Sequence, residues 1–149
     1  MTGFNLLCVT ILVFALPFAG QADPVADILS EAEADCAGFE NGRFDAGNAV
    51  TEADLDGDGT NDHLVDTARF SCTSAASLYC GSGGCSLIAV VGSESWDFQV
   101  EGWRLDAWNS IPILLLARDG GWCGASGAET CFEAIRWSQG RMLTVGPQP

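Results

Sequence analysis

The sequence predicts a mainly β protein, an antiparallel sheet or small barrel with one N-terminal helix packed on it and stapled by disulfides. Helical spacing of apolar residues occurs only in residues 23–36. From residue 49 onward, short apolar or alternating segments are separated by glycine, aspartate and asparagine, as in strands joined by turns. Six cysteines follow an N-terminal apolar segment, a pattern typical of exported disulfide-bonded domains.

Residues 1–22 have the pattern of a secretory signal peptide. The run 4–19 is almost entirely apolar, and small residues precede a cleavage position after Ala22. Cleavage leaves residues 23–149 as a single disulfide-stapled domain without a membrane span. Because Met1–Gly3 lacks lysine and arginine, an uncleaved N-terminal anchor is the alternative.

The predicted helix begins at Asp23, which can cap it, and Pro24 suits the first helical position. One face collects the apolar residues Val25, Ile28, Leu29, Ala32 and Cys36. We therefore expect this face, including Cys36, to pack on the sheet.

The predicted strands follow in order along the chain. Residues 49–53 and 63–67 enter and leave an acidic segment, which makes that segment the tip of a β-hairpin. Further strands are expected at 86–91, 96–101, 111–117, 131–137 and 142–145. The segment 111–117 is apolar on both faces and is expected in the sheet centre. Residues 119–121 are expected to form a hairpin turn.

The acidic segment 54–62 carries the sharpest chemical signal, because acids alternate with other residues and glycines lie between them. A hard cation such as calcium prefers oxygen ligands, and a short loop supplies them from every second residue. The expected ligands are the side chains of Asp54, Asp56, Asp58 and Asp62 and the backbone carbonyl of Thr60. We expect calcium in a loop at residues 54–65; an acidic turn that binds no metal is the alternative.

This segment resembles the DxDxDG calcium loops of EF-hands, dockerins and thrombospondin type 3 repeats. It looks most like the strand-flanked loops of FG-GAP and VCBS-type repeats, since Leu64 and Val65 follow the last aspartate. Val65 replaces the bidentate glutamate of an EF-hand. Glu52 or Asp66 could supply an oxygen instead. The resemblance implies a structural calcium loop rather than a sensor, with a dissociation constant of about 10⁻⁴ to 10⁻³ M.

The mature chain also resembles short, uncharacterised secreted proteins of Gram-negative bacteria. The shared features are the acidic loop, the glycine-rich turn between Cys80 and Cys85, and a C-terminal strand with tryptophan. The resemblance implies a periplasmic or secreted location and no particular function.

The six remaining cysteines allow many pairings, and the sequence alone does not choose among them. We favour Cys36–Cys72, Cys80–Cys85 and Cys123–Cys131. Two of these close short loops, and the third joins the helix to the strand that leaves the acidic loop. A redox-active Cys80–Cys85 pair is the alternative to a structural bridge.

The charge distribution excludes some functions. The formal net charge is −14, with no lysine, so nucleic-acid binding is not expected. His63 is the only histidine, and the cysteines are expected to be paired, so no catalytic residues are assigned. A small carboxylate-based hydrolase is the enzymatic alternative.

The function we expect is that of an exported, non-enzymatic calcium-binding module of unknown ligand, with the calcium structural. The alternative is a carbohydrate- or protein-binding, inhibitor-like module whose partner is an envelope protein or a carbohydrate. That alternative requires an exposed aromatic face, for which Trp103 and Trp108 are the candidates.

Overall fold

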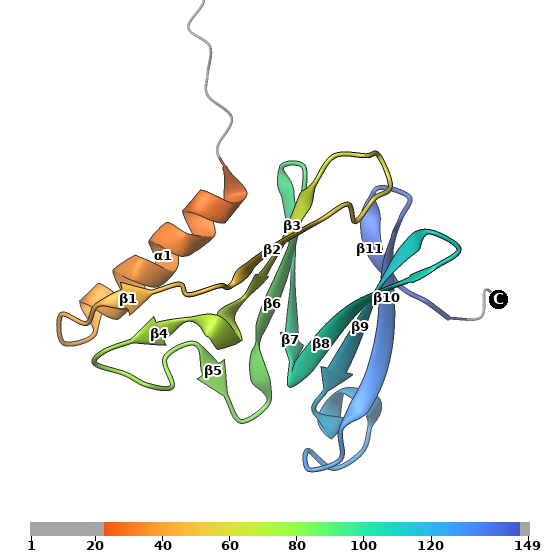
Figure 1. The fold of residues 1–149 in the computed structure, drawn as a ribbon. Coiled ribbons are helices and arrows are strands. Elements are labelled where there is room, and N and C mark those ends of the chain that lie inside the picture. Colours follow the sequence, from red (N-terminus) through yellow and green to blue (C-terminus); the bar gives the residue numbers. More distant parts are fainter. Residues whose placement is uncertain (1–22, 147–149) are drawn as a thin grey trace, which may run out of the picture.

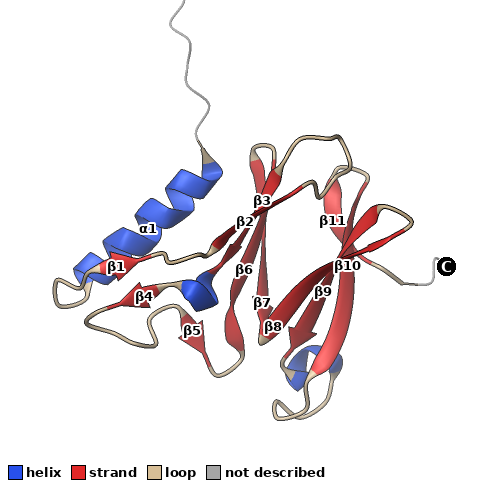
Figure 2. Ribbon diagram, viewed as in Figure 1, coloured by secondary structure: helices blue, strands red, loops and turns tan. Residues whose placement is uncertain are grey.

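The computed structural model describes residues 23–146, and the predicted signal peptide lies outside them. One α-helix, α1 (Pro24–Gly38), precedes eleven strands in this part of the chain. The mainly β class with one N-terminal helix is confirmed (Figures 1 and 2).

The first sheet contains the hairpin that carries the acidic loop. Its strands are β2 (Val50–Ala53), β3 (Asp62–Asp66), β5 (Cys80–Gly81), β6 (Gly84–Val91) and β7 (Glu94–Val100). Strand β6 pairs antiparallel with β3, with β7 and, at its start, with β5, while β2 pairs with β3.

The second sheet is formed by consecutive antiparallel strands in the order β11-β10-β9-β8. They are β8 (Gly102–Trp108), β9 (Ile111–Arg118), β10 (Cys131–Ser138) and β11 (Arg141–Thr144). The apolar segment expected in the sheet centre forms β9, between β8 and β10. Strands β1 (Phe44–Asp45) and β4 (Ser71–Cys72) make a separate two-stranded pair.

Helix α1 covers one face of the first sheet. The Asp23 carboxylate accepts hydrogen bonds from the N–H groups of Val25 and Ala26, which otherwise lack helical partners. Ala32 and Cys36 are buried, and Ala32 belongs to a cluster with Val65 of β3. The predicted apolar face of the helix is therefore the face that packs.

The main core lies between the two sheets. Its largest fully buried side chains are Leu64 and Leu87 from the first sheet and Leu114 and Leu116 from the second. Each such burial stabilises the fold by about 1.5–3 kcal/mol. The first sheet thus has the helix on one face and the second sheet on the other.

Within residues 23–146 the sheets stay open, so the barrel alternative is not observed there. The hairpin turn expected at residues 119–121 is wrong. Asp119 instead caps a 3-10 turn, η2 (Gly120–Cys123), which begins a longer connection to β10. Gly120 is required there because a Cβ atom would collide with the carbonyl oxygens of Ser126 and Glu129.

The structure contains the disulfides Cys36–Cys72, Cys80–Cys85 and Cys123–Cys131, the same three pairings that we favoured. Cys72 lies on β4 rather than on β3, so its bridge ties the end of α1 to the two-stranded pair. Cys80 and Cys85 are direct cross-strand partners on β5 and β6. The bridge Cys123–Cys131 closes the connection between β9 and β10.

Candidate metal centre

The acidic loop connects β2 to β3 and begins directly after the last paired residues of these two strands. Ala53 is the partner of Asp62, and Glu52 is the partner of His63. Within the loop, Leu55 is only 3% exposed and packs into the core between the sheets. An apolar anchor inside an otherwise polar loop fixes the position of the acids on either side of it.

Backbone N–H groups within the loop point at the aspartate side chains. Gly57 and Gly59 donate to the two oxygens of Asp54, at 2.7 and 3.0 Å. Thr60 donates to Asp58 at 2.7 Å, and Asp58 donates to Asp56 at 3.0 Å. Both glycines have positive φ (83° and 86°), which a residue with a side chain rarely adopts. The sequence therefore curls the loop around its own carboxylates.

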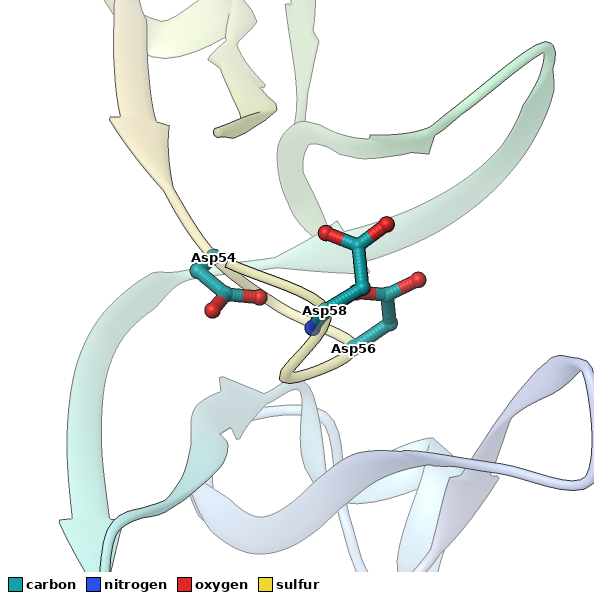
Figure 3. Close-up of side chains that lie close together, drawn as sticks. All are labelled: Asp54, Asp56 and Asp58. Atoms are coloured by element: carbon teal, nitrogen blue, oxygen red, sulfur yellow. The ribbon is translucent and has the colours of Figure 1, made fainter. Parts of the chain in front are cut away.

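This curl brings Asp54, Asp56 and Asp58 together (Figure 3). One carboxylate oxygen from each lies within 4.8 Å of the other two. Two oxygens bound to one calcium ion at about 2.4 Å can be at most about 4.8 Å apart. The three aspartates thus fit a single cation, and three like charges at this separation favour binding one.

Asp62 is not part of this cluster. It is 6% exposed, and its carboxylate accepts hydrogen bonds from the N–H groups of Leu55, at 2.9 Å, and Gly92, at 3.4 Å. Asp62 therefore ties the loop to the turn between β6 and β7. Thr60 lies on the exposed part of the loop.

Val65, at the last position of the expected loop, differs in position from Glu52 and Asp66, the two residues that could supply an oxygen in its place. Val65 is fully buried on the helix side of the sheet. Asp66 accepts hydrogen bonds from the indole N–H of Trp103, at 3.0 Å, and from the N–H of Ala68. Glu52 accepts a hydrogen bond from the Asn61 side chain, at 3.0 Å, and so contacts the loop. Of the two, Glu52 is the one associated with the loop.

A hollow of about 420 Å³ lies beside the loop. Its walls include Asp56 and Asp58, the solitary His63, Glu94 at the start of β7, and Trp137 of β10. Sequence reasoning missed both Glu94 and Trp137. Glu94 comes near residues 54–62 because β6 pairs with both β3 and β7, and Trp137 comes near because the second sheet packs on the first. Besides Asp56 and Asp58, two further carboxylates line the hollow, those of Asp62 and Glu94.

The structure does not bring Trp103 and Trp108 together. They lie on opposite faces of β8, since side chains alternate along a strand. Trp103 is half-buried against the core and bonds Asp66, whereas Trp108 is 71% exposed at the end of β8. A ligand face made of both tryptophans is therefore not present.

Within residues 23–146, no helix is long and apolar enough to span a membrane. Three disulfides indicate an oxidising environment outside the cytoplasm. Comparison with protein-family models, with curated proteins and with solved structures finds no match for this chain.

Proposed function

We propose that this protein is an exported, non-enzymatic module that binds one calcium ion in the loop between β2 and β3. The observation that carries the proposal is the convergence of Asp54, Asp56 and Asp58 on a volume the size of one coordination sphere. The loop that presents them is held in place by Leu55 and Asp62.

Calcium is the cation that best suits this donor set. The cluster offers only carboxylate oxygens. Hard cations bind such oxygens in preference to nitrogen or sulfur, whereas softer transition metals do not. Magnesium demands a tighter octahedral arrangement and keeps more of its water, so a loop rich in carboxylates favours calcium. The net charge of −14 means that a bound divalent cation also lowers the repulsion within the domain.

The calcium has a structural role in this proposal. Both strands that flank the loop belong to the packed first sheet, and Val65 is buried where a sensor loop would place its last ligand. Binding therefore orders the tip of the hairpin without moving the elements around it. We further propose that the protein acts in the periplasm or after secretion, which its disulfides support.

Titration calorimetry with the mature chain tests the proposal. We expect one calcium ion to bind with a dissociation constant of about 10⁻⁴ to 10⁻³ M. At about 10 mM calcium the ion then adds about 1.4–2.7 kcal/mol to the free energy of unfolding. Asp58→Asn should abolish most of the heat and this gain in stability. Asp27→Asn, which removes a charge from exposed helix surface, is the matched control and should preserve both.

Two outcomes would contradict the proposal. One is the absence of heat and of thermal stabilisation at millimolar calcium. The other is an equal loss of binding in Asp58→Asn and Asp27→Asn, which would mean that calcium responds to overall charge rather than to the loop.

A further inference from the structure

Strand β8 is an open edge of the second sheet. It pairs with β9 on one side, and the described residues place no strand on its other side. Residues Asn109 and Ser110 connect the two strands as a two-residue turn with positive φ at both positions, 49° and 65°. Turns of this type are flanked by a hydrogen-bonded pair, here Trp108 and Ile111.

The register then decides which backbone groups of β8 face outward. Hydrogen-bonded pairs recur at every second residue of an antiparallel ladder. The N–H and C=O groups of Trp103, Leu105 and Ala107 therefore point to the open edge. In agreement, the Ala107 N–H donates to the side chain of Asp106, at 2.8 Å, rather than to a neighbouring strand. A row of free backbone groups on an edge strand is a template for another strand.

The charges on β8 are self-complementary about Leu105. Arg104 and Asp106 flank it and form an exposed ion pair within the chain, with Nη2 3.1 Å from Oδ2 and side chains that are 70% and 56% exposed. In an antiparallel pairing of two copies centred on Leu105, Arg104 lies opposite Asp106 of the partner subunit. Symmetry repeats the contact, so two pairs of opposite charge form. The same pairing uses all the outward backbone groups of Trp103, Leu105 and Ala107.

The exposed aromatic at the end of β8 also fits this register. Trp108 would lie opposite Gly102 of the partner subunit, which has no side chain. Beside Gly102 is a mainly apolar hollow of about 340 Å³, lined also by Ala117 and by Phe132, which is 81% exposed. Gly102, Ala117 and Phe132 are successive cross-strand partners and so lie on one face of the sheet. Trp108 shares that face by alternation.

We propose that two copies of this chain associate through β8, centred on Leu105, and join their second sheets into one continuous sheet. Backbone pairing, two Arg104–Asp106 contacts and the insertion of Trp108 into the hollow at Gly102 act together. The net charge of −14 on each copy opposes association. Because salt screens this repulsion, the dissociation constant of the dimer is higher at low ionic strength.

Sedimentation equilibrium over a range of concentrations tests this pairing. The unaltered chain should show a monomer–dimer equilibrium. Arg104→Asp places aspartate opposite aspartate in both contacts, and Asp106→Arg places arginine opposite arginine. Each should raise the dissociation constant about tenfold or more. Arg136→Asp, on β10, is the matched control and should leave the dissociation constant unchanged.

Mixing the two single variants gives the decisive result. One copy then has aspartate at both positions and the other has arginine at both, so every contact is again complementary. We expect heterodimers from two variants that are each monomeric and, by circular dichroism, folded. A monomeric unaltered chain would overturn the proposal. So would dimers that tolerate Arg104→Asp, or a mixture that stays monomeric.

Discussion

Replacing Arg118 with methionine should destabilise the fold strongly, because this guanidinium joins the two sheets. Its Nε and one Nη each lie 2.8 Å from Glu133 of β10. The other Nη donates to the backbone carbonyl of Gln99 on β7, at 3.1 Å. The Trp122 ring stacks on the guanidinium at 4.4 Å. The side chain of Arg118 is 6% exposed and that of Glu133 is 25% exposed.

These exposures set the magnitude. Removing one partner of a buried ion pair costs about 3–5 kcal/mol, because the remaining charge stays buried without compensation. Water reaches part of Glu133, so we expect Arg118→Met to cost about 2–4 kcal/mol. Glu133→Met strands the more deeply buried arginine and should cost about 3–5 kcal/mol. The double variant should cost less than the sum by about 1–3 kcal/mol.

Chemical denaturation of the two single variants and the double variant measures these costs. Arg104→Met, which breaks an exposed ion pair with Asp106, is the matched control and should cost less than about 1 kcal/mol in dilute solution. A cost of Arg118→Met no larger than that of this control would show that Arg118 does not hold the sheets together. Single costs that simply add would show that Arg118 and Glu133 are not coupled.

Three further predictions follow from single contacts. Leu116→Ala should cost about 2–5 kcal/mol in denaturation, because Leu116 is fully buried between the sheets; a cost below about 1 kcal/mol would contradict that packing. Gly84→Ala should cost about 1–3 kcal/mol, since its φ is +104° and a Cβ atom would collide with the carbonyl of Val100; equal stability would contradict it. Burial, and secondarily the charge of Asp35, raise the pKa of Tyr79 above 10.0. The Tyr79 hydroxyl therefore keeps its proton to a higher pH in the folded state than in the unfolded state. The free energy of unfolding should fall as the pH rises above 10.0, and Tyr79→Phe should remove this decline. Tyr79 is the single tyrosine of the chain, so its phenolate absorbance can be titrated directly, and a titration without a raised pKa would contradict this prediction.

The sequence predicted the elements whose patterns are local. The helix was visible because its cap and its apolar spacing are both contained in residues 23–36. The central position of β9 followed from apolar residues on both of its faces. In the loop, the alternation of Asp54, Asp56 and Asp58 predicted the cluster that the structure shows.

Features that depend on distant partners could not be predicted in this way. Alternation places Arg118 on the inner face of β9, but only Glu133 and Gln99 make its burial favourable. The glycine pair at residues 120–121 is typical of a hairpin turn. In the structure, Gly120 instead lets the backbone lie close to the carbonyl oxygens of Ser126 and Glu129. Likewise, periodicity places Asp62 in a calcium loop but does not reveal its hydrogen bond to the turn between β6 and β7.

Nuclear magnetic resonance of the isotope-labelled mature chain can test whether the loop between β2 and β3 holds one calcium ion. Gly57 and Gly59 donate to the carboxylate of Asp54, so their amide signals should shift most as calcium is added. The shifts should approach saturation at about 10 mM calcium and be confined to the loop and to the turn at Gly92. Unmoved signals of Gly57 and Gly59 at saturating calcium, or shifts centred elsewhere in the domain, would contradict the account.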